Sequence, residues 1–339
     1  MSGGMKSPKR FLVIGCGSIG KRHLGNLLAL KADVMAFDIQ EAPRREVKRK
    51  FDIEVVDRLE EAWERNPQVA LIAVPTSLHV ALALQAAKHG CHLFIEKPLS
   101  DKLEGVDQLL NSVRKRALTT LVGCNMRFHP GLVKVKRILE EGGVGRVVAA
   151  RVEVGQYLPD WHPREDYRMG YSARLELGGG VILDAIHEID YIRWMLGEVE
   201  SVACFAGKLS HIDIETEDTA AILLRFLDGA IGEVHMDYVQ RAHSRTCHII
   251  GDEGTILWDY NTGEVRWYSV AKQEWQTFPN PPGWETNQMY IDEMKHFIKC
   301  IAGDEKPLLD VFDATRVLKI ALAAKESARK GSVIKLIGR

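Results

Sequence analysis

One hexapeptide near the N-terminus has the residues and spacing of a dinucleotide-binding turn. Gly15 to Gly20 reads G-C-G-S-I-G and fits the pattern G-x-G-x-x-G. In that pattern the first glycine allows a tight turn, the second lets a pyrophosphate approach the backbone, and the third lets a helix pack closely on a strand. The N-terminus of the following helix would offer N–H groups and the positive end of its dipole to the phosphates. The cofactor-binding residues expected here are Gly15, Gly17, Ser18, Ile19 and Gly20.

An acidic residue lies where such a fold binds the adenosine ribose. Asp38 comes eighteen positions after Gly20, at the end of a second apolar run. A carboxylate there accepts hydrogen bonds from both ribose hydroxyls and repels a 2′-phosphate, so the sequence favours NAD over NADP. Two alternatives stay open: Arg44 and Arg45 follow closely and could pair with a 2′-phosphate, or Asp38 could only cap a turn.

A lysine lies at the end of a later apolar run, in Glu96-Lys97-Pro98. At the carboxyl edge of a parallel sheet this lysine would lie beside the nicotinamide, where a lowered pKa would suit it to hydrogen-bond or deprotonate a substrate hydroxyl. The loop with Pro75, Thr76 and His79 should reach the same edge. We expect these residues and Glu96 to contact the cofactor. For His79 the alternative is an ordinary residue in the first turn of a helix.

A second group of chemically useful residues follows three glycines at positions 178–180. On one helix over 181–196, Asp184, His187 and Tyr191 fall at i, i+3 and i+7 and share a face. His187 titrates near neutrality and could take a hydroxyl proton while hydride leaves the carbon. The alternative is a structural histidine with Asp184 as a capping group. A metal site using Asp160, His162, Asp184, His187 and Glu188 matches no known ligand spacing, so we predict no metal.

The segment from 156 to 168 is rich in aromatic, charged and proline residues. Aromatic rings offer flat apolar surface to a polyhydroxyl ligand, and arginines can hold a carboxylate or phosphate. The alternative is a rigid structural or subunit-contact loop. The substrate-binding residues that we predict in it are Tyr157, Trp161, Arg164, Tyr167 and Arg168.

The elements that must position these residues fall into two halves. Up to residue 124, apolar runs alternate with helical patterns, as in a parallel sheet with crossover helices. The strands expected there are 11–14, 34–37, 53–56, 70–74, 92–96 and 120–124, and the helices 19–30, 43–50, 59–65, 78–88 and 103–117. The later half predicts a mostly antiparallel sheet from strands 147–158, 199–209, 219–227, 231–239, 246–250, 255–260 and 264–269, with helices 181–196, 288–301 and 314–329.

Length, charge and cysteine usage narrow the class of protein. With 339 residues, the chain exceeds the roughly 250–300 residues that one core supports, so two domains are expected. The net charge of −1 and the absence of long charged runs argue against nucleic acid or a membrane surface as a partner. The apolar run 11–14 is too short for a signal peptide or membrane span. Six scattered cysteines without a C-x-x-C pair indicate reduced thiols and a cytoplasmic protein.

Together these motifs resemble the glucose-fructose oxidoreductase, inositol dehydrogenase and rhizopine-catabolism family, called Gfo/Idh/MocA. The resemblance covers nearly the whole chain and includes residues 125–130, Asn-Met-Arg-Phe-His-Pro. It implies an α/β protein with a doubly wound Rossmann domain over 1–125 and a substrate-binding and oligomerisation α/β domain over 126–305 with a large open, mostly antiparallel sheet. It also implies a C-terminal helix in 306–339 that packs back on the first domain, and a homodimer or homotetramer formed through the open sheet.

The resemblance further implies reversible oxidation of a secondary alcohol on a sugar, sugar derivative or cyclitol, with Lys97, Asp184 and His187 as catalytic residues. Asn125 and Arg127 would then contact the substrate. The family usually separates this aspartate and histidine by four positions, whereas here the separation is three. Similarity to enzymes of bacterial surface-sugar biosynthesis adds sugar nucleotides and amino sugars as candidates. The rivals are an oxidoreductase of dihydrodiols or tetrapyrroles and a non-catalytic NAD-sensing regulator, which would need neither Lys97 nor His187.

Overall fold

A computed structural model describes residues 9–161 and 166–336 of the chain. The described chain groups into two compact units. Unit 1 contains Met1–Gly123 and Tyr290–Ala314, and unit 2 contains Cys124–Met289 and Thr315–Arg339. The predicted boundary after residue 125 lies close to the end of the first segment of unit 1, whereas the predicted boundary after residue 305 has no counterpart.

Unit 1 is built around a six-stranded parallel sheet. Its strands are β1 (Arg10–Ile14), β2 (Asp33–Phe37), β3 (Glu54–Val56), β4 (Val69–Ile72), β5 (His92–Glu96) and β6 (Thr120–Gly123), in the order β3-β2-β1-β4-β5-β6. The helices between them are α1 (Ser18–Ala29), α2 (Glu41–Phe51), α3 (Leu59–Glu64), α4 (His79–Lys88) and α5 (Val106–Arg116). This is the strand order of a doubly wound dinucleotide fold, and the predicted fold class is confirmed.

A helix from much later in the chain completes the core of unit 1. Helix α9 (Asn287–Ala302) contributes Met294 and Phe297, which are fully buried with Phe94 and Leu24 in one apolar cluster. The helical pattern over 288–301 was predicted, but it was assigned to the second domain. Its apolar face is buried against the parallel sheet, so most of the helix belongs to unit 1.

The glycine turn between β1 and α1 is as tight as the sequence predicts. Gly15 has a φ of +102°, and a Cβ on Gly20 would lie 1.9 Å from the carbonyl oxygen of Gly15. By contrast, a Cβ on Gly17 would meet no atom within 4 Å. Two glycines are therefore required by the fold, whereas Gly17 leaves open space in front of the backbone.

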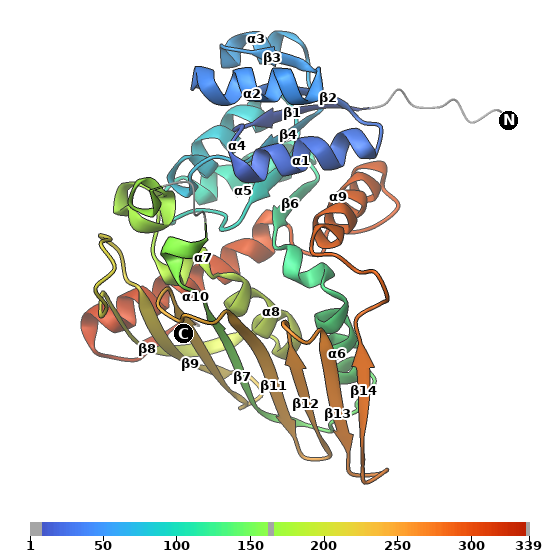
Figure 1. Cartoon of the computed structure of the whole chain (residues 1–339), viewed down its shortest axis with the longest axis vertical. Helices are drawn as coiled ribbons and strands as arrows, with labels where there is room; N and C mark the ends of the chain where they lie inside the picture. The colour runs from blue at the N-terminus through green and yellow to red at the C-terminus, as the bar shows by residue number, and fades with distance from the viewer. Residues whose placement is uncertain (1–8, 162–165, 337–339) are drawn as a thin grey trace, which may run out of the picture. The chain divides into compact units, whose positions relative to one another are not determined.

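Unit 2 contains a nine-stranded mixed sheet, whose larger strands lie side by side in Figure 1. Its strands are β7 (Val147–Gly155), β8 (Val199–Gly207), β9 (Thr219–Phe226), β10 (Ile231–Asp237), β11 (Ser244–Gly251), β12 (Gly254–Asp259), β13 (Glu264–Ser269), β14 (Glu274–Pro279) and β15 (Ile334–Lys335). The order is β14-β13-β12-β11-β7-β10-β9-β8-β15, and among the described strands of this sheet only β7 and β10 pair in parallel. Strands β14 and β15 were not predicted.

The sheet of unit 2 has one covered and one open face. In β9, Ile222 and Leu224 are buried, whereas Leu223 and Arg225 between them are exposed. Helices α6 (Pro130–Glu140), α7 (Val181–Asp184), α8 (His187–Leu196) and part of α10 (Val311–Lys330) also belong to this unit. Short 3-10 turns are η1 (Thr76–Leu78) in unit 1 and η2 (Asn125–Phe128), η3 (Leu158–Asp160), η4 (Tyr167–Met169), η5 (Tyr171–Ala173) and η6 (Leu175–Leu177) in unit 2.

The last helix is divided between the two units, because its first residues, Val311–Ala314, group with unit 1. From Thr315 onward α10 belongs to unit 2. The hydroxyl of Ser327 accepts a hydrogen bond from the backbone N–H of Cys204 in β8, at 2.9 Å. Because β15 then pairs with β8, the end of the chain extends the sheet of unit 2.

The predicted single helix over 181–196 is wrong, because the helix is broken between Asp184 and His187. Helix α7 ends at Asp184, Ala185 has φ −89° and ψ +29°, and α8 starts at His187. The argument that Asp184, His187 and Tyr191 share one face of a continuous helix therefore fails. All three side chains are buried.

No helix among the described residues is both long and apolar enough to cross a membrane. All six cysteines are buried and reduced.

His129 fixes the start of α6 in unit 2. Its Nδ1 accepts a hydrogen bond from the backbone N–H of Gly131 at 3.0 Å, and its side chain is fully buried. The rings of Trp258 and Trp284 lie 5.0 Å and 4.7 Å away, centroid to centroid. Burial, with a smaller contribution from the charge of Arg245, lowers the pKa of His129 to about 4.

We therefore expect unit 2 to lose stability in mild acid. The folded pKa of His129 is depressed below the unfolded value of 6.5, so the unfolded chain binds more protons between pH 6.5 and 4. The free energy of unfolding should fall as pH drops through this window, by up to about 3 kcal/mol from this residue. In thermal unfolding from pH 7.5 to 4.5, His129→Asn keeps an acceptor for Gly131 and should show a smaller pH dependence than the wild type. An equal dependence in both proteins would contradict the assignment.

The glycine turn predicts opposite effects for two alanine substitutions. Gly20→Ala puts a methyl group against a backbone carbonyl and should lower the free energy of unfolding by about 2–3 kcal/mol. Gly17→Ala should change it by less than about 0.5 kcal/mol, yet weaken dinucleotide affinity at least about 10-fold because the methyl group fills the open space. Gly25→Ala, whose Cβ would lie 3.6 Å from Phe51, is the control on the same helix. Denaturant unfolding and titration with NADH measure both effects.

Candidate active site

Four strands of unit 1 end at the edge of the sheet where a dinucleotide would bind. The glycine turn follows β1, Asp38 follows β2, Pro75 follows β4, and Lys97 follows β5. In parallel sheets of this order, ligands bind at the carboxyl ends of the strands, where the order reverses between β1 and β4. The prediction that these residues meet at one sheet edge is therefore supported by the topology.

Asp38 is tied to the glycine turn. Its Oδ2 accepts a hydrogen bond from the backbone N–H of Cys16 at 2.7 Å, and its Oδ1 accepts one from that of Gln40 at 2.8 Å. Each carboxylate oxygen has a second lone pair, so ribose hydroxyls can still donate to it. Asp38 thus both caps the turn and keeps the capacity that the sequence predicted.

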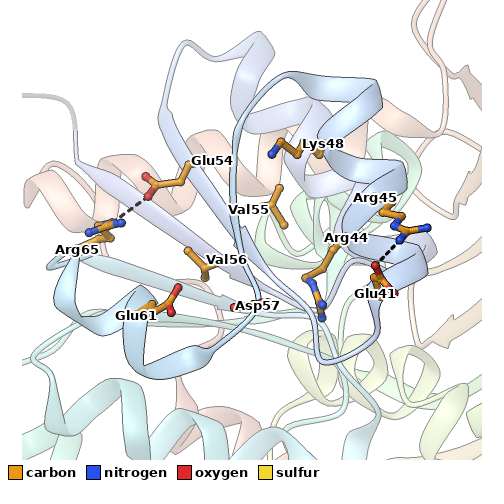
Figure 2. A pocket seen from close by; sticks show the side chains of 10 residues that line it. All are labelled: Glu41, Arg44, Arg45, Lys48, Glu54, Val55, Val56, Asp57, Glu61 and Arg65. Carbon is orange, nitrogen blue, oxygen red and sulfur yellow. Dashed lines mark hydrogen bonds and ion pairs between the residues drawn. The ribbon is translucent and has the colours of Figure 1, made fainter.

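The two arginines after Asp38 have partners in the protein. Arg44 Nη1 donates to the carbonyl oxygens of Asp38 and Ile39 at 2.8 Å and 2.9 Å, and Arg45 pairs with Glu41 at 2.5 Å. Both line a pocket of about 440 Å³ between α2, β3 and α3 (Figure 2). Its other lining residues are Lys48, Glu54, Val55, Val56, Asp57, Glu61 and Arg65. Cationic and acidic side chains balance in this pocket, so it offers no excess positive charge to a 2′-phosphate.

The glycine turn fits a dinucleotide pyrophosphate. Gly17 and Ser18 are exposed, Ile19 is half-buried, and no side chain caps the start of α1. The amide groups of the first helical turn therefore face the open space in front of Gly17. Gly17, Ser18, Ile19 and Asp38 would hold NAD.

The buried side chain of Glu96 holds the turn that contains Lys97. Glu96 Oε1 lies 2.6 Å from Nε2 of His23 on α1, and Glu96 Oε2 accepts a hydrogen bond from the backbone N–H of Lys97 at 3.2 Å. Glu96 is 6% exposed, whereas Lys97 is half-exposed. The Lys97–Pro98 peptide bond is cis. Glu96 was predicted to contact the cofactor, but both its oxygens are engaged inside the protein.

His79 is also an internal residue. It is 1% exposed, its Nδ1 lies 2.8 Å from the carbonyl oxygen of Pro98, and its Nε2 lies 2.8 Å from that of Val74. Burial lowers the pKa of His79, which opposes the effect of these carbonyls. The prediction that His79 contacts the cofactor does not fit this geometry, because both ring nitrogens face backbone oxygens. Thr76 is buried as well, and Pro75 is half-buried.

In unit 2, Asp184 is the centre of a buried hydroxyl cluster. Tyr171 donates to Oδ1, while Ser172 and Tyr238 donate to Oδ2 at 2.6 Å and 3.0 Å. Burial and the nearby Asp184 carboxylate raise the pKa of Tyr238 well above its usual value, so this phenol stays a donor. These tertiary bonds hold the carboxylate at the point where α7 ends.

His187 begins a helix whose next turns carry buried ion pairs. Asp190 accepts from Nε and Nη2 of Arg127 at 2.9 Å and 2.7 Å. Glu188 lies 2.8 Å from Nε of Arg245 on β11. His187 itself is 9% exposed. The ion pairs fix α8 against two other elements and so fix the position of His187.

These contacts correct the prediction for residues 125–130. The Arg127 side chain is 2% exposed and is bound to Asp190 through two of its nitrogens. Its guanidinium therefore stabilises the fold and is not presented to a substrate. Asn125 is 4% exposed.

The predicted substrate loop is partly held by its own contacts. Arg168 bonds Asp166 through Nε and Nη2 at 2.8 Å and 2.7 Å, and Asp213 lies 3.7 Å from its Nη1. The hydrogen bond to Asp166 raises the pKa of Arg168 above its usual value. Tyr167 accepts a hydrogen bond from the backbone N–H of Asp213 at 3.3 Å. Arg168 is thus not available as an unpaired cation for an anionic ligand.

Two aromatic residues of the same loop, Tyr157 and Trp161, contact other side chains of unit 2. The Arg241 guanidinium lies 3.6 Å from the ring centroid of Tyr157. Trp161 meets Tyr238 edge to face at 5.4 Å between centroids, so it lies one ring away from Asp184. Arg164, together with His162 of the discarded metal hypothesis, lies outside the described residues.

Several residues that shape the site were not found from the sequence. His23, Tyr171, Ser172 and Tyr238 are far in sequence from the groups that they bond. Only the position of His23 on the face of α1 that packs against the sheet could have indicated an interior role. No cluster of histidine, cysteine and acidic side chains suited to a metal occurs among the described residues.

Comparisons with known proteins agree with this fold. Residues 9–124 match the family described as "Oxidoreductase family, NAD-binding Rossmann fold", and residues 132–257 match the GFO/IDH/MocA C-terminal domain. Myo-inositol 2-dehydrogenase of Thermotoga maritima is 30% identical over 96% of this chain and 98% of its own length. Scyllo-inositol 2-dehydrogenase (NAD(+)) of Bacillus subtilis is 26% identical over 98% and 97%.

A solved structure of levoglucosan dehydrogenase with NADH and levoglucosan has the same fold, with a TM-score of 0.88, 23% identity, and coverage of 98% of this chain and 100% of that one. The matched models cover most of both units, and the match to the inositol dehydrogenase spans nearly the whole chain. The chain therefore belongs to the GFO/IDH/MocA family of oxidoreductases with an NAD-binding Rossmann fold.

Proposed function

We propose that this protein is an NAD-dependent dehydrogenase that oxidises a secondary alcohol of a cyclitol or sugar, in a reversible reaction. The observation that carries the proposal is the position of Lys97 at the carboxyl end of β5, on the same sheet edge as the glycine turn and Asp38. A sensor of NAD would need the turn and Asp38 but not a half-exposed lysine held by a buried acid.

In the proposed mechanism one residue acts as a general base and another as a hydrogen-bond donor. NAD, when bound at the glycine turn, supplies the hydride acceptor. His187 takes the proton of the substrate hydroxyl as general base. Lys97 hydrogen-bonds the same oxygen and stabilises the negative charge that develops on it. Asp184 keeps the turn before His187 in place through its three hydroxyl partners.

The charges of unit 2 favour a neutral polyol over an anionic substrate. Arg168, one of the two arginines that the sequence offered for a carboxylate or phosphate, and Arg127, a predicted substrate residue, are paired with carboxylates of the protein. A neutral ligand with several hydroxyl groups needs polar donors and acceptors but no unpaired cation. Inositols therefore fit better than sugar nucleotides, in agreement with the names of the inositol dehydrogenases above.

We further propose that the protein acts in the cytoplasm and forms a homodimer or homotetramer through the open face of its large sheet. The reduced cysteines support a reducing compartment. On the open face, Phe205, Leu223, Ile231 and Ile250 are 86%, 52%, 45% and 37% exposed. The strand registers put these four side chains on one side of the sheet. Apolar residues gathered in this way indicate an interface.

Replacing Lys97 tests the catalytic proposal. Lys97→Met keeps the length of the side chain but cannot donate to an alkoxide, so kcat should fall at least about 100-fold, whereas the Kd for NADH should change less than about 3-fold. The substrates to test are myo-inositol, scyllo-inositol, glucose and a sugar nucleotide. Lys102→Met, at an exposed lysine paired with Glu104, is the matched control and should keep full activity. Retained turnover in Lys97→Met would rule out the proposed role.

Sedimentation tests the proposed interface. Leu223→Glu puts a charge on the open face and should shift the protein towards the monomer by burying an unpaired charge. Leu103→Glu, at a similarly exposed leucine of unit 1, should leave the mass unchanged. A wild-type protein that sediments as a monomer at micromolar concentration would contradict this part of the proposal.

A further inference from the structure

Two buried histidines reach the turn that contains Lys97 from two different helices. His23 lies on α1 and is fully buried, and His79 is the first residue of α4 and is 1% exposed. Helix α1 starts after the glycine turn, and α4 starts after the loop that contains Pro75. Both helices therefore begin at the sheet edge that would hold the dinucleotide.

His23 acts on the turn through Glu96. The short contact between Nε2 of His23 and Oε1 of Glu96 lies in a fully enclosed environment. A Cβ on Gly123 of the neighbouring strand would lie only 3.1 Å from the same carboxylate oxygen, so the carboxylate has little room to move. The other oxygen of Glu96 accepts from the N–H of Lys97. The position of the Lys97 backbone is therefore coupled to α1.

His79 acts on the other side of the turn. Its Nδ1 faces the carbonyl oxygen of Pro98, directly after Lys97, and its Nε2 faces the carbonyl oxygen of Val74 at the end of the preceding loop. The neutral ring has one N–H, so it donates to one of these oxygens and contacts the other, and it lies between the loop after β4 and the turn after β5. Since neither ring nitrogen faces solvent, His79 contacts these backbone carbonyls and does not reach a ligand.

We propose that His23 and His79 are positioning residues for Lys97: together they fix the lysine turn to the two helices whose starts face the dinucleotide. The inference rests on the proposed role of Lys97. Neither histidine is proposed to contact cofactor or substrate. Glu96 links the two elements, because it contacts His23 on α1 and the backbone N–H of Lys97. Displacing a catalytic group by about 1 Å costs about 100-fold in rate, so loss of either contact should lower turnover strongly.

Variants at His79 separate this role from simple packing. His79→Asn places an amide N–H near the position of Nδ1, where it can donate to Pro98, whereas His79→Gln places one near Nε2, where it can donate to Val74. Both changes remove the same ring from the same core. We expect kcat to fall about 100-fold in His79→Gln and less than about 10-fold in His79→Asn, with similar thermal unfolding and an unchanged Kd for NADH.

His23 offers a second pair of variants and a control. His23→Leu deletes the contact with Glu96, whereas His23→Gln keeps a donor near Nε2 and should restore most of the turnover. Leu27→Ala, one turn later on α1, removes buried apolar contacts without touching Glu96 and should lower stability but not kcat. Equal losses in both variants of a pair, or a loss of kcat in Leu27→Ala as large as in His23→Leu, would overturn the proposal.

Amide hydrogen exchange tests the contacts without any substrate. In the peptide over 93–99, His23→Leu and His79→Gln should speed exchange about 10-fold because the turn is released, and His23→Gln, His79→Asn and Leu27→Ala should not. This readout separates the two proposals. A protein that oxidises no polyol but shows this exchange pattern would overturn the proposed function and leave the positioning contacts standing. Unchanged exchange in His23→Leu and His79→Gln would overturn the positioning role itself.

Discussion

Helix α1 comes so close to strand β1 that a methyl group on Gly20 would lie 1.9 Å from the carbonyl oxygen of Gly15. This approach decides where the rest of the helix lies. His23, on the next turn of α1, can then reach Glu96 at the end of β5, and Glu96 in turn holds the backbone N–H of Lys97. The distance that brings amide groups to a pyrophosphate thus also sets the position of the lysine. The glycine turn and the backbone of Lys97 are thus linked through one helix.

In unit 2 the constraint is different, because helix α8 carries charged side chains into the interior. Buried charges are costly unless they are paired and hydrogen-bonded, and removing one partner of a buried pair costs about 3–5 kcal/mol. Asp190 and Glu188 on α8 are each paired with an arginine from another element, Arg127 and Arg245. These contacts resist any shift of α8. Arg127, which the sequence predicted as a substrate residue, thus takes part in a buried ion pair that keeps α8 in place.

Local patterns predicted most elements, and tertiary contacts explain where they failed. The six strands of unit 1 and the position of Lys97 followed from short apolar runs and glycine chemistry, which act within a few residues. The break at Ala185 did not, because neither Ala185 nor Ile186 disfavours a helix. Hydroxyl groups of Tyr171 and Tyr238, thirteen and fifty-four positions away, hold Asp184 where α7 ends. The ion pair of Arg127 was missed for the same reason, since its partner Asp190 lies sixty-three positions away.

The pKa values of five buried cysteine thiols limit the redox chemistry of their side chains. Cys16 lies inside the glycine turn, where a helix N-terminus would favour a thiolate, yet its side chain points into the core. Burial, helped by the charge of Asp38, raises its pKa to about 12, and burial raises those of Cys91, Cys204 and Cys247 to about 12 and that of Cys300 to about 11. Thiol–disulfide exchange needs a thiolate, which these groups do not supply at neutral pH. These five thiols are therefore not the oxidant in the proposed reaction, whose hydride acceptor is the dinucleotide that the glycine turn would hold.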